Sequence, residues 1–113
     1  MLLLGCVISN PDLAEEVLAA MIEAGITTAT VVESQGMGRV ISERMPIFAG
    51  FRNLWGGAEP YGRFIFTIVE PAQADAVIPL LKDVIFDTKG DGKAKGVIFT
   101  LPVAEFHKPS PAR

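Results

Sequence analysis

Residues 89–96 (Lys-Gly-Asp-Gly-Lys-Ala-Lys-Gly) combine glycines and lysines in a pattern that could bind an anion. Glycine has no Cβ and lets backbone N–H groups turn toward an anion, while lysine supplies compact positive charge. A β-rich run follows at 97–101, whereas the P-loop and the dinucleotide-binding fingerprint place their glycines at the start of a helix. The segment is therefore either a different kind of anion-binding loop or an ordinary helix-to-strand connection.

A second turn of similar composition lies earlier in the chain. Gly36, Gly38 and Arg39 come directly after a β-branched run at 27–33. Two residues without side chains and one guanidinium again favour an anion. Each turn is weak evidence by itself, so the hypothesis of a bound anion depends on the two acting together.

Catalysis and metal binding find little support in the side chains present. The chain has one histidine, His107, and one cysteine, Cys6. These two residues, about a hundred positions apart, do not make a tetrahedral metal site within one chain. His107 lies in a tail, and no nucleophile is marked for a Ser-His-Asp arrangement. We therefore expect neither an enzyme nor a resident metal, although single residues could still meet across the symmetry axis of an oligomer.

Composition sets the broad class. The 113 residues are half hydrophobic, which predicts a single domain, 1–113, that buries roughly two-thirds of its unfolded surface. A net charge of −3 argues against a nucleic-acid partner, which would require a basic face. The lone cysteine excludes an intrachain disulfide and fits a cytoplasmic protein. No run approaches the roughly 18 apolar residues of a membrane span, so no membrane insertion is expected.

The first half of the chain predicts a strand, a helix and a second strand. Residues 2–9 form an apolar run that is typical of a central strand, with Cys6 packed as a small hydrophobe. Asn10 and Pro11 are favourable at a helix start, and Gly25 is favourable just past a helix end. The β-branched residues at 27–33 predict the second strand.

Residues 40–62 have no regular hydrophobic period, yet they are rich in apolar side chains. A long stretch without regular structure is uncommon in a compact domain and is usually functional. One interpretation packs these side chains on the domain or on a neighbouring subunit. The alternative is a loop that folds onto a partner protein, with Phe48, Phe51 and Trp55 as anchors.

The second half predicts the same order of elements. Phe64, Phe66 and Ile68 alternate in a strand at 63–69, and a helix begins at Pro71. Pro79 inside that helix predicts a kink or a restart, because proline removes one backbone hydrogen bond. A last strand at 97–101 precedes a proline-rich tail at 104–113.

This order predicts an α+β fold of the ferredoxin-like βαββαβ type, with a four-stranded antiparallel sheet and two helices on one face. The strands are so apolar that the other face also needs a cover. We expect oligomerisation to supply that cover.

The turn at 36–39 (Gly-Met-Gly-Arg) and the segment 90–93 (Gly-Asp-Gly-Lys) are two motifs through which the whole chain resembles the PII-like family of nitrogen regulatory proteins, as a divergent member. Residues 25–39 are similar to the family's second strand and to the Gly-x-Gly-Arg that opens its T-loop, and 57–59 (Gly-Ala-Glu) to part of that loop. Residues 90–93 (Gly-Asp-Gly-Lys), with 98–103 (Ile-Phe-Thr-Leu-Pro-Val), are similar to its B-loop and fourth strand.

The resemblance implies a homotrimer that binds ATP or ADP between subunits and regulates an enzyme or a transporter of nitrogen metabolism through the T-loop. By position, the implied T-loop base and phosphate cradle are Gly36, Gly38, Arg39, Gly90, Asp91, Gly92 and Lys93. Lys108 stands near the family's first C-terminal arginine.

The chain also departs from the family pattern. The family runs from the B-loop lysine directly into Ile-Phe, whereas residues 94–97 intervene here. A second register is therefore open, in which Lys95 and Gly96 occupy the Asp-Gly positions. Val40 replaces the glutamine that serves 2-oxoglutarate and magnesium, so 2-oxoglutarate is not expected. Pro60 takes the place of the modifiable tyrosine, and Ser110 that of the second C-terminal arginine.

Three hypotheses follow. The first is a trimeric sensor in which a small anionic ligand bridges residues 36–39 of one chain and 90–96 of a neighbour and orders residues 40–62. The second is a ligand-independent interaction module that uses the apolar residues 45–55. The third is a metal-tolerance protein of the same fold.

Overall fold

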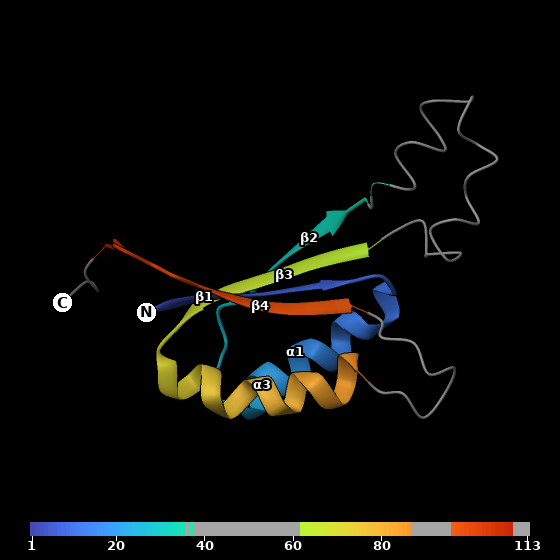
Figure 1. Cartoon of the computed structure of the whole chain (residues 1–113), viewed down its shortest axis with the longest axis horizontal. Coiled ribbons are helices and arrows are strands. Elements are labelled where there is room, and N and C mark those ends of the chain that lie inside the picture. The colour runs from blue at the N-terminus through green and yellow to red at the C-terminus, as the bar shows by residue number, and fades with distance from the viewer. Residues whose placement is uncertain (36, 38–61, 87–95, 110–113) are drawn as a thin grey trace.

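The computed structural model describes residues 1–35, 37, 62–86 and 96–109. The elements are β1 (Leu2–Ile8), the 3-10 helix η1 (Pro11–Leu13), α1 (Ala14–Glu23), β2 (Thr30–Ser34), β3 (Gly62–Val69), α3 (Pro71–Ile85) and β4 (Gly96–Pro102). The four strands form one sheet, and both helices lie on the same side of it (Figure 1). The predicted α+β fold is confirmed.

The strands are ordered β2-β3-β1-β4, and every neighbouring pair is antiparallel. β1 is central, so that Cys6 lies between Ile65 of β3 and Ile98 of β4. The predicted strands agree with this sheet except at the start of the second, where 27–29 lie outside β2. These residues connect α1 in one layer to the sheet in the other, and the chain joins the ladder only where Thr30 pairs with Phe66.

Alternate residues of the sheet form one core with the helices. Leu4, Cys6 and Ile8 of β1 are fully buried, as expected from the apolar run. Burial raises the pKa of the Cys6 thiol to about 11, because a thiolate would lose its hydration there. Cys6 is therefore a packed, protonated side chain. The helices contribute the remaining large buried residues, which include Val17, Met21, Val77, Leu81 and Ile85.

The first helix begins and ends where the sequence predicts. The Asn10 side chain accepts a hydrogen bond from the Asp12 N–H at 2.9 Å, and the first turn at Pro11 is 3-10 rather than α-helical. At the other end, Gly25 has a φ of +83°, a conformation that costs glycine little. The Ile26 N–H then donates to the Met21 carbonyl at 2.8 Å, which completes a Schellman motif.

The second helix runs through Pro79 without a break (Figure 1). The predicted restart at this residue is therefore wrong. Proline removes the bond to the Asp75 carbonyl, but both residues are exposed, so water can bind that oxygen. Burial of Val77 and Leu81 against the core holds the two halves of the helix together.

The sheet face away from the helices is apolar. Phe64 stacks on Phe66 with ring centroids 5.1 Å apart and on Phe99 at 6.1 Å. Gly5 leaves room for this cluster, because a Cβ there would lie 2.4 Å from the Phe99 ring. Val7 and Leu101 on the same face are 38% and 51% exposed. No described segment covers this face. The cover that the apolar strands require is therefore still missing from the described chain.

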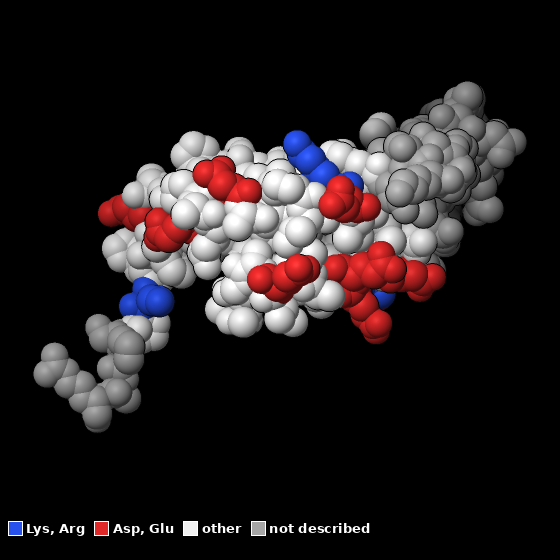
Figure 2. Space-filling view, turned by 90° about the horizontal axis from the view of Figure 1, so that it is seen from below, with Lys and Arg blue, Asp and Glu red and all other residues white. Residues whose placement is uncertain are grey.

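The outer surface of the helix layer has a different character. Figure 2 views this layer from outside and shows acidic side chains spread over it, with few basic ones. The helical residues that carry these charges include Glu15, Glu16, Asp75 and Asp83. An acidic helix surface does not attract a phosphate backbone.

Candidate functional site

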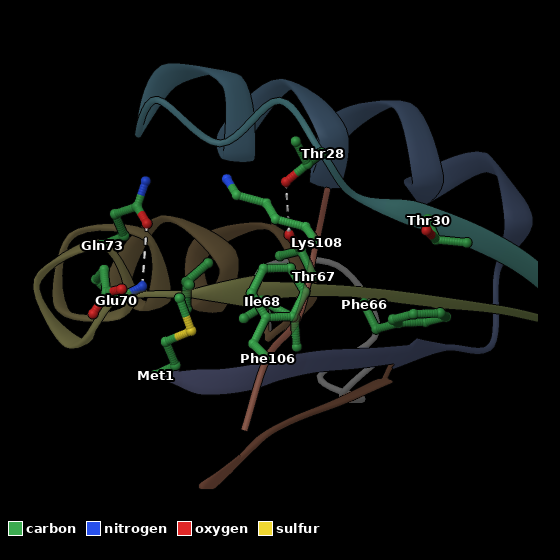
Figure 3. A pocket seen from close by; sticks show the side chains of 11 residues that line it. Met1, Thr28, Thr30, Phe66, Thr67, Ile68, Glu70, Gln73, Phe106 and Lys108 are labelled. Carbon is green, nitrogen blue, oxygen red and sulfur yellow. Dashed lines mark hydrogen bonds between the residues drawn. The ribbon is translucent and has the colours of Figure 1, made fainter. Parts of the chain in front are cut away.

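A cavity of about 370 Å³ lies at the end of the sheet where β1 begins and β3 ends (Figure 3). Its volume lies within the range of about 300–1,000 Å³ that is usual for small-molecule pockets. Four parts of the chain meet there: the N-terminus, the connection into β2, the β3–α3 junction and the tail. The lining residues are Met1, Thr28, Thr30, Phe66, Thr67, Ile68, Val69, Glu70, Gln73, Phe106 and Lys108. We call this cavity the end pocket.

Two hydroxyl groups form one polar edge of the end pocket. The Oγ1 atoms of Thr28 and Thr67 lie 3.3 Å apart and share a hydrogen bond. Thr67 is only 3% exposed, so its hydroxyl needs this partner. Because a hydroxyl can donate and accept, the pair can turn either function toward a ligand.

The β3–α3 junction supplies a second polar edge. The backbone N–H of Glu70 donates to Gln73 Oε1 at 3.2 Å, and the Glu70 carboxylate accepts from the backbone N–H of Gln73. The two bonds together make a capping box. The first of these bonds fixes the orientation of the Gln73 amide. Among the described residues, nothing accepts a hydrogen bond from its Nε2 group.

The walls of the end pocket are apolar and aromatic. Phe66 and Ile68 come from β3, and Phe106 comes from the tail (Figure 3). The Val103 N–H donates to the Met1 carbonyl at 3.1 Å and so holds the tail beside the start of β1. The same tail carries Lys108, the one cationic side chain among the described residues of the lining. This combination suits a flat ring that carries acceptors or negative charge.

The residues predicted to bind a ligand divide into two groups. Gly96 and Lys108 belong to the described chain. Gly96 begins β4 opposite Ile8, whereas Lys108 lies beyond the other end of that strand. At ~3.4 Å per residue the length of β4 alone separates them by roughly 20 Å, so one chain does not bring them together. Gly36, Gly38, Arg39, Gly90, Asp91, Gly92, Lys93 and Lys95, and the partner-binding candidates Phe48, Phe51 and Trp55, lie outside the described residues.

The described ends of the two glycine-rich segments lie at the same end of the sheet. Ser34, the last residue of β2, pairs with Gly62, and Gly96 pairs with Ile8, which in turn pairs with Arg63. Three strand spacings therefore separate β2 from β4 at this end, about 14 Å at 4.8 Å each. We call this region, with Ser34, Arg63 and Gly96, the loop end.

Gly96 has a structural reason to be glycine. A Cβ at this position would lie 2.3 Å from the Val7 carbonyl oxygen, and a backbone atom cannot move aside cheaply. Its identity is explained by the close approach of β1 and β4. This reason holds whether or not Gly96 also contacts a ligand.

Arg63 is a cation of the loop end, and from the sequence we predict for it only a position in a strand. Its Nη1 donates to the Gly62 carbonyl at 3.0 Å, and its Nη2 lies 3.6 Å from Glu33 Oε1. The Arg63 side chain is 25% exposed and the Glu33 side chain 79%. The signal that could have identified it is the antiparallel register, which pairs Glu33 with Arg63.

Other kinds of site find no support in the described part of the chain. It contains no group of three potential metal ligands, and His107 lies 3.8 Å from Glu105 at an exposed position. Within the same residues, no helix is long and apolar enough to cross a membrane.

Comparisons with known proteins place the chain in a family. The model of the family "Nitrogen regulatory protein P-II" matches residues 4–109. No curated protein sequence matches the chain. Among solved structures, PII of Arabidopsis thaliana bound to citrate is similar with a TM-score of 0.62 and 19% identity, over 90% of this chain and 76% of that one. That similarity supports the fold, and the family match supports the assignment.

The sequence resemblance is thus confirmed, and so is the expectation of a protein that is not an enzyme, because PII proteins are non-enzymatic regulators. Membership also implies a role in signalling or regulation. The low identity marks the chain as divergent. It belongs to the nitrogen regulatory protein P-II family.

Proposed function

We propose that this chain is a PII-type regulator that binds a small anionic ligand with an aromatic ring in a cleft between subunits, and that signals the bound state to a partner protein. The observation that carries this proposal is the division of ligand-binding features between the two ends of one sheet. The end pocket offers aromatic walls and Lys108, while the loop end offers Arg63 and two glycine-rich segments.

A neighbouring subunit can join the two ends. PII family proteins form trimers, and the apolar sheet face with the Phe64 cluster supplies a surface that such an assembly would bury. In this arrangement the end pocket of one subunit holds the ring, and the loop end of its neighbour faces the charged groups. Arg63 suits phosphate oxygens there because its guanidinium can donate several hydrogen bonds.

A nucleotide meets both requirements, because it joins an aromatic base to a chain of phosphates. ATP and ADP are the first candidates, since the family generally binds them. The backbone at 36–39 and 90–96 would contact the phosphates. The hypothesis drawn from the sequence takes these two segments from neighbouring chains, whereas in this proposal both belong to the loop end of one subunit. 2-Oxoglutarate is not part of the proposal, because Val40 stands where the family's glutamine serves that ligand.

The ligand would act on residues 40–62, which follow the turn at 36–39. A ligand shifts a segment only by binding one of its conformations better than the others. The proposed output is a change in the fit of Phe48, Phe51 and Trp55 to an enzyme or a transporter. PII proteins are typically cytoplasmic, and we propose the same compartment for this chain.

Calorimetry with ATP, ADP and AMP on the full chain tests this function. We expect saturable binding that becomes weaker at high salt, because phosphate contacts are ionic. Light scattering on the same samples gives the oligomeric state, and a trimer is expected. A protein that is monomeric at the concentrations used, or that gives no heat with any of the three nucleotides, would rule out the shared nucleotide site.

An assay of partner capture with and without nucleotide separates the ligand-independent interaction module from the regulator. That module predicts that Trp55→Ala prevents capture of a partner, while nucleotide leaves capture unchanged. The regulator predicts that nucleotide changes capture by the wild-type chain.

A further inference from the structure

We propose that Phe106 is the residue on which the ring of the ligand stacks, so that the tail rather than the sheet binds the ring in the end pocket. This inference rests on the proposed function, because it assigns the ring contact within that site. The family resemblance marks Lys108 in the tail but does not mark Phe106.

The first step is the direction in which the tail side chains point. Phe106 and Lys108 line the end pocket. The side chains of Glu105 and His107, which alternate with them, are 79% and 84% exposed. Every second residue of this stretch therefore faces the cavity, and the tail presents one aromatic ring and one ammonium to it.

The second step is the attachment of the tail to the domain. The Val103 N–H donates to the Met1 carbonyl at 3.1 Å, and among the described residues no backbone–backbone hydrogen bond follows it along the tail. The contact between His107 and Glu105 lies within the tail and does not fasten it to the sheet. Side-chain contacts therefore hold residues 104–109 in place, so Phe106 can adjust to a ring that enters the cavity.

The third step compares Phe106 with Phe66, the other aromatic residue of the lining. The Phe66 ring stacks on Phe64 with the centroids 5.1 Å apart, so one of its faces is occupied. Phe106 is 44% exposed and has no ring partner within the described chain. Figure 3 shows the two lining rings at separate places along β3. Phe106 is therefore the lining ring with both faces available.

The surroundings of Phe106 suit a flat ring. A half-exposed phenylalanine alone on a surface would need no explanation. Phe106 instead faces a cavity whose other walls include the apolar side chains of Phe66 and Ile68. Stacking on an aromatic side chain tolerates every base, because each base has a π-face. The contact therefore requires a ring and does not depend on which base supplies it.

Calorimetry with ATP, ADP and AMP on the full chain compares the wild type with three variants of Phe106. We expect Phe106→Ala to weaken nucleotide binding about tenfold, the size of effect that loss of one stacked base produces. Phe106→Leu should weaken it severalfold, because leucine keeps apolar area but has no ring face. Phe106→Tyr keeps the ring and should bind like the wild type.

Phe86→Ala is the matched control. Phe86 is 37% exposed, close to the value for Phe106, but it lies at the C-terminal end of α3 and outside the lining of the end pocket. Its replacement should leave nucleotide affinity unchanged. Circular dichroism melting curves of all variants verify the fold.

Phe106→Trp adds a readout that a purely structural role would not change. ATP should quench the fluorescence of the added indole, because the base stacks on it. Phe86→Trp should show no more quenching than the wild type, which contains Trp55. Tripolyphosphate carries the negative charge without a ring, so it should not quench Phe106→Trp more than it quenches the wild type.

Each result decides a different claim. Weaker binding in Phe106→Ala, recovery in Phe106→Tyr and no loss in Phe86→Ala support the inference. If Phe106→Ala or Phe106→Leu binds as tightly as the wild type, or if Phe86→Ala loses as much as Phe106→Ala, stacking on Phe106 is refuted while the nucleotide site stands. Quenching of Phe106→Trp by tripolyphosphate as strong as that by ATP would refute the ring contact. If ATP, ADP and AMP all fail to bind the wild type, the proposed function fails, and this inference fails with it.

Discussion

The two ends of the sheet carry different kinds of chemistry. The end pocket is formed by side chains: two threonine hydroxyls, a glutamine amide, aromatic walls and one ammonium. The loop end is formed by backbone and charge, with Gly96 tight against Val7 and Arg63 beside Glu33. Neither end alone offers both a ring site and a phosphate site. The site proposed above therefore combines one end from each of two subunits.

The largest expected effect is a loss of stability in Gly96→Ala, which tests whether this glycine of the loop end has a packing role apart from ligand binding. Gly96→Ala places a Cβ 2.3 Å from the Val7 carbonyl oxygen, so the β1–β4 ladder must shift. We expect the free energy of unfolding to fall by about 3 kcal/mol, at the upper end of the usual cost of overpacking. Urea denaturation measures this loss. An unfolding free energy equal to that of the wild type would show that the strands do not meet this closely.

Lys108→Gln in the end pocket is the counterpart of Gly96→Ala at the loop end. Lys108 is exposed, and the described structure gives it no ion pair, so stability should change by no more than about 0.5 kcal/mol. Nucleotide affinity should fall severalfold and become less sensitive to salt. If Lys108→Gln destabilised the chain as much as Gly96→Ala does, the distinction between the two ends would be lost.

The next effect is a pH dependence of stability that comes from Cys6, in the core between the two ends. The folded-state pKa of Cys6 is raised to about 11 by burial, above the ordinary value of 9.0. Between these two pH values the unfolded chain releases the thiol proton while the folded chain keeps it, so stability falls as pH rises. The loss is on the order of 2 kcal/mol at pH 11, and below pH 9 this group contributes no pH dependence.

The measurement compares the wild type with Cys6→Ala in urea at pH 8, 9, 10 and 11. Cys6→Ala should be less stable at pH 8, because it leaves a small cavity, but its stability should decline less steeply above pH 9. Parallel declines in the two proteins would assign the alkaline loss to other groups. A thiol reagent at pH 8 should label Cys6 only as the chain unfolds.

Much of the fold could be predicted from local patterns. Asn10, Pro11 and Gly25 indicate the ends of the first helix because capping chemistry depends on neighbouring residues alone. The restart expected at Pro79 does not occur, because the cost of one lost hydrogen bond is outweighed by burial of Val77 and Leu81, which a local pattern does not measure.

The site was less predictable for a similar reason. Lys108 was identified through the family resemblance, and the structure places it in the end pocket. Thr28, Thr67 and Gln73 have ordinary sequence environments, and they converge only when the connection into β2 is assembled with β3 and α3. Gly96 shows the opposite case, since a residue in a motif of ligand-binding type has a packing reason of its own.

A moderate effect is expected from the hydroxyl pair of the end pocket. Thr67→Val keeps the shape of the side chain and removes the hydroxyl that bonds Thr28, which is exposed and can bind water instead. We expect stability to change by less than about 1 kcal/mol and nucleotide affinity to fall severalfold. Thermal melts and calorimetry measure the two quantities, and Thr27→Val serves as an exposed control outside the pocket lining. Unchanged affinity would remove this pair from the ligand site.

The smallest expected effect concerns the cation of the loop end. Glu33 is 79% exposed and 3.6 Å from Arg63, so water screens the pair and its net contribution to stability is small. Glu33→Gln should therefore leave the free energy of unfolding within about 0.5 kcal/mol of the wild type. It also removes a carboxylate that competes with an anion for the Arg63 guanidinium. Nucleotide affinity at low salt should consequently rise about twofold, and the gain should vanish at high salt.

Arg63→Gln supplies the opposite change and makes this test specific. If Arg63 faces the phosphates, its loss weakens nucleotide binding, and adding Glu33→Gln to Arg63→Gln gives no further gain. A gain from Glu33→Gln that persists without Arg63 would mean that the carboxylate acts on the ligand directly or through another cation. In that case the loop end would keep its glycine-rich segments as candidates for binding the phosphates, but Arg63 would lose its proposed contact with them.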